Sequence, residues 1–417
     1  MRRVGRTGRW LERAFVVLVL GAVAFFAYRW PVQWSGDVLA APAKSRINTV
    51  IPPSYFGMTI NTIGLKRSWP DLEFGGVRLW GAIWWAKMNP APGVYDWKRF
   101  DDILDIAARH HVDVTFNLAY TPRWAAAVKD APPSWTPGAS SPPVDLSIWE
   151  EWVRAVVTRA AGRIRYWEVW NEPEDPDFYS GDVPTMVAMQ RGAYEVIKAI
   201  DPSLMVLTPS SNGTPQGYRW QKAFLAQGGG QFADIFAFHG YMNEPEAIIG
   251  TIGRFRRMLE QHDLADKPMW DSEAGWSARE ENQAGCLVRS YVLKWIYGLD
   301  RFYWYELEGG GADYGKLSEP AGRLLAGGIA YRTAHRWLVG ATVVSVSRKG
   351  ASTWAVELRQ ASGVRSLLVW NAAGSSKYPV GPGYHRYQSI DEGEAPITGG
   401  AVEIGPKPLL LLSGAPG

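Results

Sequence analysis

The amino-acid sequence predicts an α/β protein: a (β/α)₈ barrel, followed by a small antiparallel β-sandwich and preceded by a membrane segment. Short apolar runs alternate with segments of helical periodicity from about residue 50 to about residue 338, and this alternation is typical of a parallel barrel. The length of 417 residues suits a barrel of about 250–300 residues and one smaller unit. A hydrophobic content of 47% and a charged content of 20% allow a large core.

Eight apolar runs are predicted to be the strands of the barrel. Each is a short run of mainly apolar residues, most of them rich in β-branched or aromatic side chains. They cover residues 55–59, 76–80, 112–117, 165–170, 204–208, 235–239, 268–271 and 301–305. We therefore assign residues 49–338 to the barrel.

Helices are predicted where apolar residues recur every three or four positions between these runs. In residues 97–110, for example, Phe100, Ile103 and Leu104 share one face. Asp145 is a suitable N-cap for the helix that follows it. The predicted helices cover residues 97–110, 146–161, 184–200, 246–262 and 283–297.

The pattern changes after about residue 340, where short strands are separated by Gly, Pro and Asn turns. The predicted strands cover residues 342–347, 354–358, 366–370, 384–389, 401–404 and 409–412. Such a series is typical of a small antiparallel β-sandwich, which we assign to residues 339–417.

The first 30 residues have the pattern of a signal anchor or a signal peptide. Residues 14–28 carry no charge, and five arginines precede them. The run is shorter than the about 20 residues that usually span a bilayer, but flanking arginines can extend to the bilayer surfaces. We favour an uncleaved anchor in the inner membrane, with residues 31–48 as a linker and the barrel in the periplasm. The alternative is a cleaved signal peptide, which would leave a periplasmic or secreted protein.

Composition argues against several classes of partner and cofactor. The six arginines of residues 1–30 exceed the overall formal charge of +3, so the rest of the chain has no positive surplus and no nucleic-acid partner is expected. One cysteine and six scattered histidines give no zinc-type spacing, and no Walker loop or dinucleotide fingerprint occurs. We therefore expect no metal and no organic cofactor, and we favour a monomer.

Two glutamates stand at the ends of predicted barrel strands, where the catalytic side chains of barrel enzymes lie. Glu172 follows the fourth strand and Glu273 follows the seventh. Glycoside hydrolysis requires two facing carboxyl groups, one protonated to protonate the leaving oxygen and one ionised to attack or stabilise the anomeric carbon. The pair therefore predicts a glycoside hydrolase.

Other glutamates compete for these roles. The letters Asn-Glu-Pro-Glu occur twice, once with Glu172 and once with Glu244. Glu172 and Glu273 are 101 residues apart, which leaves room for three βα units. Glu244 and Glu273 are only 29 residues apart and would come from adjacent strands, so the spacing favours Glu172. Two further candidates after the eighth strand are interpreted as subsite or structural residues: Glu306 and Glu308.

The motif Trp-Asn-Glu-Pro at residues 170–173, with Glu273 three strands later, resembles clan A of the glycoside hydrolases. Over about residues 50–340 the chain resembles family 39, the β-xylosidase and α-iduronidase family. Within that family it is most similar to the bacterial, membrane-anchored exopolysaccharide hydrolases of the Psl endoglycosidase type. The resemblance implies retaining hydrolysis by double displacement, with Glu172 as acid/base and Glu273 as nucleophile.

The resemblance also implies roles for five neighbouring residues. Arg78, at the end of the second strand, would keep the nucleophile ionised. Asn171 would bind a sugar 2-hydroxyl, and His239 and Tyr241 would orient the nucleophile. Trp304 would be the platform beneath the sugar in subsite −1. The alternatives are a structural ion pair for Arg78 and a core position for Trp304.

The expected substrate is a β-linked polysaccharide or oligosaccharide. The 22 tryptophans suit packing against the apolar faces of sugars, and the long loops after the second and third strands suit a groove. We therefore predict an endo-acting hydrolase of a bacterial exopolysaccharide. Two alternatives stay open: an exo-acting, β-xylosidase-like enzyme on oligosaccharides, and a non-catalytic carbohydrate-binding protein.

Overall fold

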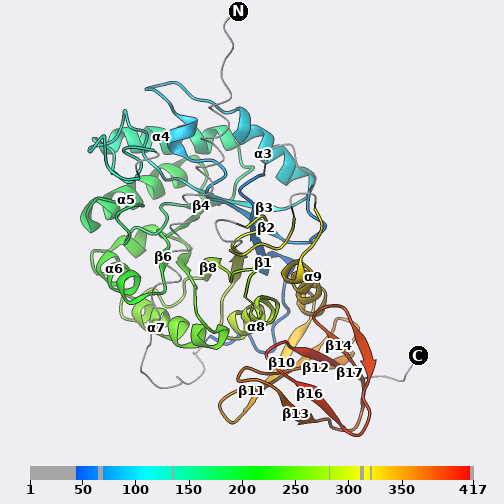
Figure 1. Cartoon of the computed structure of the whole chain (residues 1–417). Helices are drawn as coiled ribbons and strands as arrows, with labels where there is room; N and C mark the ends of the chain where they lie inside the picture. Colours follow the sequence, from blue (N-terminus) through cyan, green and yellow to red (C-terminus); the bar gives the residue numbers. More distant parts are fainter. Residues whose placement is uncertain are drawn as a thin grey trace, which may run out of the picture.

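The computed structural model describes residues 44–63, 69–133, 136–280, 282–309, 314–319 and 322–413. The parallel strands of this part of the chain form one curled sheet in the order β5-β4-β3-β2-β1-β9-β8-β7-β6. A parallel bridge between Leu207 and Ile235 connects β5 to the residue before β7 and closes the ring. The predicted barrel is therefore confirmed, and Figure 1 shows its strands at the centre with helices around them.

All eight predicted strands are present, and a short second piece continues the fifth. Their bounds are β1 (Phe56–Thr59), β2 (Gly76–Leu79), β3 (Asp113–Asn117), β4 (Tyr166–Glu168), β5 (Met205–Leu207), β6 (Ser211–Asn212), β7 (Phe236–His239), β8 (Met269–Ala274) and β9 (Arg301–Trp304). Pro209 separates β5 from β6, because proline has no N–H for the ladder. β6 still belongs to the ring, since Ser211 pairs with Phe238 of β7.

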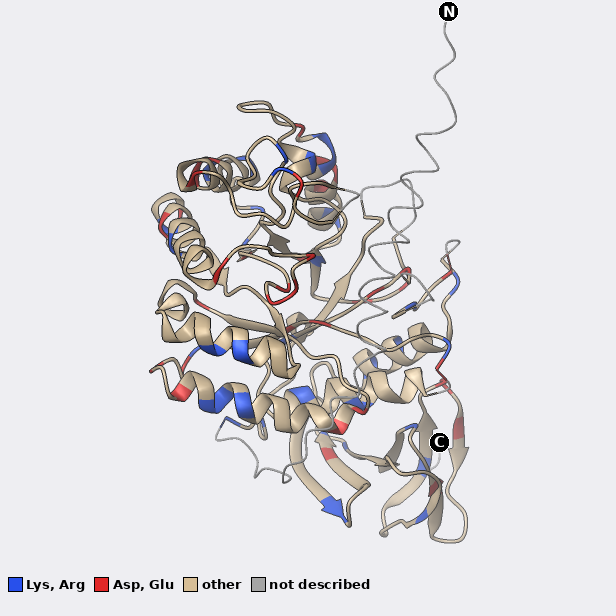
Figure 2. Ribbon diagram, turned by 60° about the vertical axis from the view of Figure 1, so that its left-hand side comes forward, with Lys and Arg blue, Asp and Glu red and all other residues tan. Residues whose placement is uncertain are grey.

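The five predicted helices are present, and three further α-helices accompany them in the described residues. Their bounds are α2 (Trp85–Met88), α3 (Lys98–Arg109), α4 (Leu146–Ala160), α5 (Val183–Ile200), α6 (Pro215–Ala226), α7 (Ile248–Glu260), α8 (Gln283–Ile296) and α9 (Ala326–Leu338). Short 3-10 turns are η1 (Pro53–Tyr55), η2 (Gly229–Phe232) and η3 (Pro245–Ala247). Charged residues of both signs occur along the helices around the barrel (Figure 2).

α6 was not predicted, although its start has ordinary helix signals. The Thr214 side chain caps the helix by accepting from the Gly217 N–H (3.1 Å), and Pro215 occupies the first turn. Gly217 interrupts the apolar pattern of this turn. It is required there because a Cβ at this position would lie 2.0 Å from the Asn212 carbonyl oxygen. The close contact with Asn212 thus requires a glycine, which interrupts the apolar periodicity by which α6 could have been predicted.

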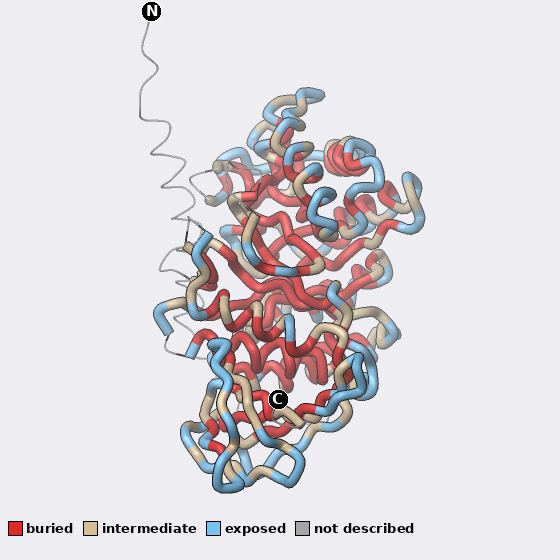
Figure 3. The backbone as a smooth tube through the Cα atoms, turned by 90° about the vertical axis from the view of Figure 1, so that its right-hand side faces the viewer, coloured by how far each residue is buried: buried red, intermediate tan, exposed pale blue. Residues whose placement is uncertain are grey.

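The core is a continuous buried layer inside and around the barrel (Figure 3). Inside the ring, one apolar cluster contains Leu207, Ile235, Ala237, Trp270 and Tyr303. Most tryptophans of the described residues are buried and fill the space between strands and helices. The tryptophans with almost no exposed surface include Trp85, Trp149, Trp152, Trp167, Trp170, Trp304 and Trp370.

The C-terminal part changes from parallel to antiparallel strands after α9, as predicted. Six strands form one sheet in the order β10-β11-β12-β17-β14-β15, and β13 pairs with β16 in a second sheet. Their bounds are β10 (Thr342–Lys349), β11 (Thr353–Arg359), β12 (Arg365–Asn371), β13 (Ser376–Pro379), β14 (Tyr384–Ser389), β15 (Glu394–Pro396), β16 (Ala401–Ile404) and β17 (Leu409–Ser413). β13 and β15 were not predicted, because each contains only one apolar residue besides proline and so gives no alternation to recognise.

The two antiparallel sheets pack face to face, and the larger sheet also packs on the barrel. Val402 and Ile404 of the small sheet share an apolar cluster with Val369 and Leu411 of the large one. Figure 1 shows these strands beside α8 and α9. On the barrel side, the Trp337 Nε1 of α9 donates to Gln388 of β14 (2.9 Å).

The predicted membrane segment and most of the predicted linker lie outside the described residues. In the part of the chain that the structure describes, no helix has the length and apolar character needed to span a bilayer. Residues 44–48 of the predicted linker contact the body of the protein. The Arg46 N–H donates to Ile296 O (3.1 Å), and the Asn48 N–H donates to Val343 O (2.7 Å).

Candidate active site

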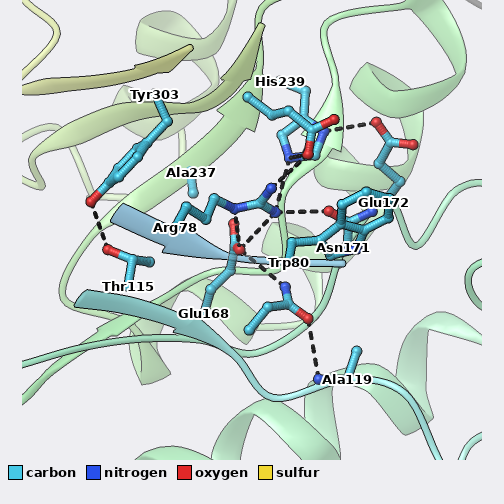
Figure 4. Close-up of polar contacts among 12 residues, drawn as sticks. Arg78, Trp80, Thr115, Ala119, Glu168, Asn171, Glu172, Ala237, His239 and Tyr303 are labelled. Carbon is cyan, nitrogen blue, oxygen red and sulfur yellow. Dashed lines mark hydrogen bonds and ion pairs between the residues drawn. The ribbon is translucent and has the colours of Figure 1, made fainter. Parts of the chain in front are cut away.

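Six of the seven predicted site residues meet at one end of the barrel, because parallel strands place all their C-terminal ends on one face. They are Arg78 on β2, Asn171 and Glu172 after β4, His239 on β7, Tyr241 after β7 and Glu273 on β8. Trp304, at the end of β9, contacts Gly315 and Trp276 instead of these six. Figure 4 shows Glu168, Asn171 and His239 gathered around Arg78.

Arg78 is the centre of the site and is completely buried. Its Nε donates to Glu168 Oε2 (2.8 Å), and its Nη1 donates to Glu273 Oε2 (2.6 Å). Its Nη2 donates to Asn171 Oδ1 (2.7 Å) and lies 3.4 Å from His239 Nε2. Two buried carboxylates therefore share one fixed positive charge, and the same guanidinium positions the predicted nucleophile.

Glu168 is a site residue that the sequence analysis missed. It is completely buried on β4, and its Oε2 also accepts from Asn117 Nδ2 (3.0 Å). Burial raises its pKa, but the charge of Arg78 and the other polar neighbours together outweigh burial, and the pKa of Glu168 lies below its ordinary value. A carboxylate in the middle of the apolar run 165–170 was the available signal, because a buried charge needs a buried partner.

Arg78→Met is expected to lower the free energy of unfolding by about 3–5 kcal/mol, because Glu168 and Glu273 would be left as buried charges without a cation. Urea unfolding followed by circular dichroism measures the loss. Arg289→Met is the matched control, since the Arg289 side chain is 1% exposed but its two carboxylate partners are 65% and 18% exposed. Those carboxylates can be hydrated, so the control should lose clearly less. Equal losses would contradict the shared-charge argument.

Glu273 is held at both carboxylate oxygens. Arg78 donates to Oε2, and the Tyr241 hydroxyl donates to Oε1 (2.7 Å). Burial raises the pKa of Glu273 above its ordinary value, while the charge of Arg78 and the hydrogen bond from Tyr241 act in the opposite direction. Arg78 therefore counteracts burial instead of bringing the pKa below its ordinary value.

Glu273 points into the barrel, although the simple alternation of its strand would turn it outward. Trp270 belongs to the apolar cluster inside the ring. Asp271 faces the helix layer, where its carboxylate lies 2.6 Å from Lys294 Nζ of α8. Successive strand residues face opposite sides, so Glu273 would be expected on the same side as Asp271.

A one-residue bulge in β8 reverses this alternation. Phe238 of β7 lies opposite Asp271, and the next residue, His239, lies opposite Glu273. Ser272 is therefore the extra residue of β8. Bulges of this kind occur next to active sites, where they change the direction of a side chain. Here the bulge brings Glu273 onto the same side as His239.

Glu172 follows β4 in a backbone conformation that is uncommon for a residue with a side chain. Its φ is 45°, in the left-handed region, and its N–H donates to Ser210 O (2.8 Å). Its Oε1 lies 2.7 Å from His239 Nδ1. Burial raises the pKa of Glu172 to about 7. Such a backbone at a buried carboxyl group is typical of functional sites.

His239 connects Glu172 to the arginine. Burial lowers the pKa of His239 below its ordinary value, so the ring is neutral at pH 7. Its Nε2 faces the Arg78 guanidinium, which can only donate, so Nε2 presents its lone pair. Nδ1 then carries the proton and donates to Glu172 Oε1. The imidazole therefore fixes the position of Glu172 relative to Arg78.

The two predicted catalytic carboxylates are close together. One oxygen of Glu172, one oxygen of Glu273 and one ring nitrogen of His239 lie within 4.8 Å of one another. This closeness favours the retaining arrangement, with carboxyl groups about 5–5.5 Å apart, over the inverting one at about 6.5–9.5 Å. By residue type the same three groups could ligate a divalent cation. Arg78 already donates to Glu273 in this space, and its fixed positive charge opposes a second cation.

Asn171 and Trp304 differ in what they present to a ligand. The Asn171 Nδ2 is buried and has no hydrogen-bond partner within the described residues, so this donor is available to a ligand. Trp304 has no exposed surface. Its Nε1 donates to Gly315 O (2.7 Å), and its ring stacks on Trp276 at a centroid distance of 6.0 Å. A platform role for Trp304 stays a prediction.

The competing glutamates are bound elsewhere. The side chain of Glu244 is 65% exposed and pairs with Arg289 of α8 (3.2 Å). Glu306 and Glu308 are held by the loop after β1: Glu306 accepts from the Asn61 side chain, and Glu308 accepts from the Thr62 N–H (3.0 Å). This placement agrees with the spacing argument that preferred Glu172.

Comparison with known proteins shows a shared fold. No family model matches the chain. A solved family 39 glycoside hydrolase from the gut symbiont Bacteroides cellulosilyticus is similar, with a TM-score of 0.71 and 17% identity, over 88% of this chain and 83% of that one. A monomeric β-xylosidase from Caulobacter crescentus has a TM-score of 0.63 and 16% identity, over 88% and 97% of the two chains.

A more distant similarity extends to another hydrolase family. A family 30 endoxylanase from Clostridium papyrosolvens has a TM-score of 0.62 and 11% identity, over 89% of this chain and 98% of that one. At these identities the comparisons establish the fold, and the chemistry has to be argued from the side chains themselves.

Proposed function

We propose that this protein is a retaining β-glycosidase with Glu172 as acid/base and Glu273 as nucleophile. One observation carries the proposal: the buried carboxylates of Glu172 and Glu273 lie within 4.8 Å of each other but have different partners. Glu273 accepts from the Arg78 guanidinium and the Tyr241 hydroxyl, which favours the ionised form. Glu172 lacks a direct cation and has a pKa of about 7, which favours the protonated form.

The proposed reaction has two displacements. In the first, the Glu273 carboxylate attacks the anomeric carbon, the glycosidic C–O bond breaks, and Glu172 gives its proton to the leaving oxygen. In the second, Glu172 takes a proton from water, the water oxygen bonds to the anomeric carbon, and Glu273 leaves as a carboxylate. The free Asn171 Nδ2 is suited to donate to the sugar hydroxyl beside the reacting carbon.

Proton NMR of the first product tests the proposal, with aryl β-glycosides as substrates. The initial sugar product should have the β configuration, and inhibitors that form a covalent glycosyl-enzyme should label Glu273. An α-configured first product would refute the double displacement. A protein that binds sugars but hydrolyses none of a panel of neutral, amino and acidic β-glycosides would favour the non-catalytic alternative.

The substrate we propose is a bacterial exopolysaccharide, cut internally, as in the Psl endoglycosidase type. A contact between the two long loops that follow β2 and β3 supports this proposal. The Trp124 Nε1 in the second loop donates to Asn89 O in the first (2.8 Å), and Trp124 itself is half-buried. A half-buried indole of this kind can pack against a sugar ring.

One observation favours the exo-acting, β-xylosidase-like alternative. Glu172 and Glu273 are only 3% and 1% exposed, as expected for a narrow site that takes one chain end. Product profiles at early times on purified exopolysaccharides and on xylo-oligosaccharides decide between the modes. Oligosaccharides as the first products support endo action, and monosaccharide as the sole first product supports exo action.

The pH dependence of kcat/KM is expected to be bell-shaped, with the upper limb near pH 7. Glu172 must be protonated to act as acid, so activity is present below its pKa of about 7 and falls as the pH rises through that value. The lower limb follows protonation of Glu273 and lies above the ordinary range of a glutamate, because burial raises its pKa. Initial rates between about pH 4 and 9 measure both limbs. In Glu172→Gln the upper limb should disappear, and a profile unchanged by this substitution would exclude Glu172 as the acid.

We further propose that residues 1–30 anchor the protein in the inner membrane, with the barrel in the periplasm. The uncharged residues 14–28 and the arginines before them support this location. In cell fractionation, full-length protein should pellet with the inner membrane and be accessible to protease in spheroplasts. A mature N-terminus near residue 42, found in the periplasm or medium, would support the cleaved signal peptide instead.

A further inference from the structure

Asp271 lies outside the barrel, two residues before the proposed nucleophile, and connects two parts of the site through the backbone. Its Oδ1 accepts from the Gly240 N–H (3.0 Å) and from the Glu273 N–H (3.3 Å). Gly240 stands between His239 and Tyr241, which contact Glu172 and Glu273. One carboxylate oxygen therefore links the backbones that carry the nucleophile and its two polar neighbours.

The bulge of β8 explains why this contact is needed. Ser272 is an extra residue, so the β8–β9 ladder is irregular between Asp271 and Ala274. A buried N–H in such a stretch needs a partner other than the neighbouring strand. The Asp271 carboxylate supplies this partner for the Glu273 N–H, and it does so from the first residue of the bulge.

The carboxylate itself is compensated by a buried lysine. Lys294 Nζ of α8 lies 2.6 Å from Asp271 Oδ2, and the two side chains are 1% and 0% exposed. The same Nζ lies 3.3 Å from the centroid of the Phe302 ring, which adds a cation–π contact. Lys294 thus stabilises a charged acceptor in an apolar layer, where an isolated carboxylate would lower the free energy of unfolding.

The neighbouring glycine is adapted to this carboxylate. A Cβ at residue 240 would lie 2.1 Å from Asp271 Oδ2, a distance that real Cβ atoms do not show. Gly240 is thus the residue type that lets the backbone between His239 and Tyr241 approach the carboxylate. The glycine, the aspartate and the lysine therefore form one unit around the bulge.

We propose that Asp271 is a positioning residue for the reaction: it fixes the bulge of β8 and so directs Glu273 into the site, with Lys294 as its counter-ion. The inference rests on the proposed function. A positioning role for Asp271 differs from the role of a purely structural ion pair in one respect. Catalysis depends on the hydrogen-bond acceptor at residue 271. The ion pair with Lys294 only offsets the free-energy cost of burying that charged acceptor in the core.

Two double variants distinguish a positioning role of Asp271 from that of a purely structural ion pair. Asp271→Asn with Lys294→Met removes both charges but keeps the acceptor oxygen, whereas Asp271→Leu with Lys294→Met removes the acceptor as well. Replacing a buried ion pair by neutral or apolar groups often leaves stability unchanged, so similar melting temperatures are expected for both. The Asn double variant should keep kcat within about tenfold of the parent. The Leu double variant should lose roughly 10²-fold in kcat with little change in KM, because a small misplacement of a reacting group has this effect.

The assay uses an aryl β-glycoside with a poor leaving group, so that the first displacement limits kcat and the rate reports attack by Glu273. Parental kcat in the Leu double variant, or equal losses in both double variants, would overturn the proposal. Crystal structures give a readout independent of activity: Glu273 Oε2 should leave its position 2.6 Å from Arg78 Nη1 in the Leu double variant only. If the parent protein hydrolyses no glycoside, the proposed function fails, but this distance still decides the positioning role.

Gly240→Ala perturbs the same carboxylate from the neighbouring strand. It is the alternative test if the Leu double variant does not fold. The added methyl group should displace Asp271 Oδ2 and lower kcat at least tenfold, again with little change in KM. A folded Gly240→Ala protein with parental kcat would also overturn the proposal, because the carboxylate would then tolerate displacement without consequence for Glu273.

Discussion

Glu273→Gln is expected to reduce turnover by on the order of 10⁴-fold or more on every β-glycoside, whatever its leaving group. The amide cannot form the glycosyl-enzyme bond, and no other carboxylate replaces it, since Glu168 is already committed to Arg78 and Asn117. The glutamine can still accept from Arg78, so the fold should persist. Steady-state rates and circular dichroism of the same preparation measure both effects. Activity within tenfold of the parent would remove Glu273 from the mechanism.

Chemical rescue provides the control for this variant. In Glu273→Ala, azide can occupy the space of the lost carboxylate and attack the anomeric carbon from the nucleophile side. An activated aryl β-glycoside should then give the α-glycosyl azide, with inverted configuration. A β-glycosyl azide from this variant would place the nucleophile at another residue.

Glu172→Ala is expected to lose roughly 10²–10⁴-fold in kcat/KM on substrates with poor leaving groups, because the leaving oxygen departs without a proton. Activated phenols need no protonation, so formation of the intermediate should be much less affected with them. The second step should become rate-limiting, and azide should accelerate it to give the β-glycosyl azide, with retained configuration. Opposite azide products from the alanine variants of Glu172 and Glu273 would assign both roles in one experiment.

The control for Glu172 is Glu244→Gln, which changes the same position of the repeated Asn-Glu-Pro-Glu motif. Glu244 is largely exposed and contacts Arg289, so its loss should change kcat/KM by less than about threefold. A large loss on poor leaving groups but not on activated phenols in Glu244→Gln, with a normal Glu172→Ala enzyme, would reverse the assignment.

The positions of the proposed catalytic pair were predictable because the barrel follows a simple rule. Eight apolar runs alternating with helices define the strand ends, and titratable residues just after a strand belong to one face. This rule requires no knowledge of side-chain packing. It located Arg78, Glu172, His239 and Glu273, which the structure brings together.

What escaped prediction depends on packing that a single strand does not reveal. Glu168 lies within β4, where its contacts with Arg78 and Asn117 explain a buried carboxylate. The bulge at Ser272 becomes visible only when β8 is aligned with β7. The helix α6 contains Gly217, whose presence depends on the backbone of Asn212. In each case the decisive partner is on another element of the chain.

Residues 44–51 attach to the barrel at the end opposite the candidate active site. Arg46 forms an ion pair with Asp300, just before β9, and the Ile51 N–H donates to Ala341 O (2.9 Å). These contacts lie where the barrel strands begin, while Glu172 and Glu273 lie where the strands end. Residue 44 therefore lies at the floor of the barrel, and the mouth that holds Glu172 and Glu273 opens on the opposite side.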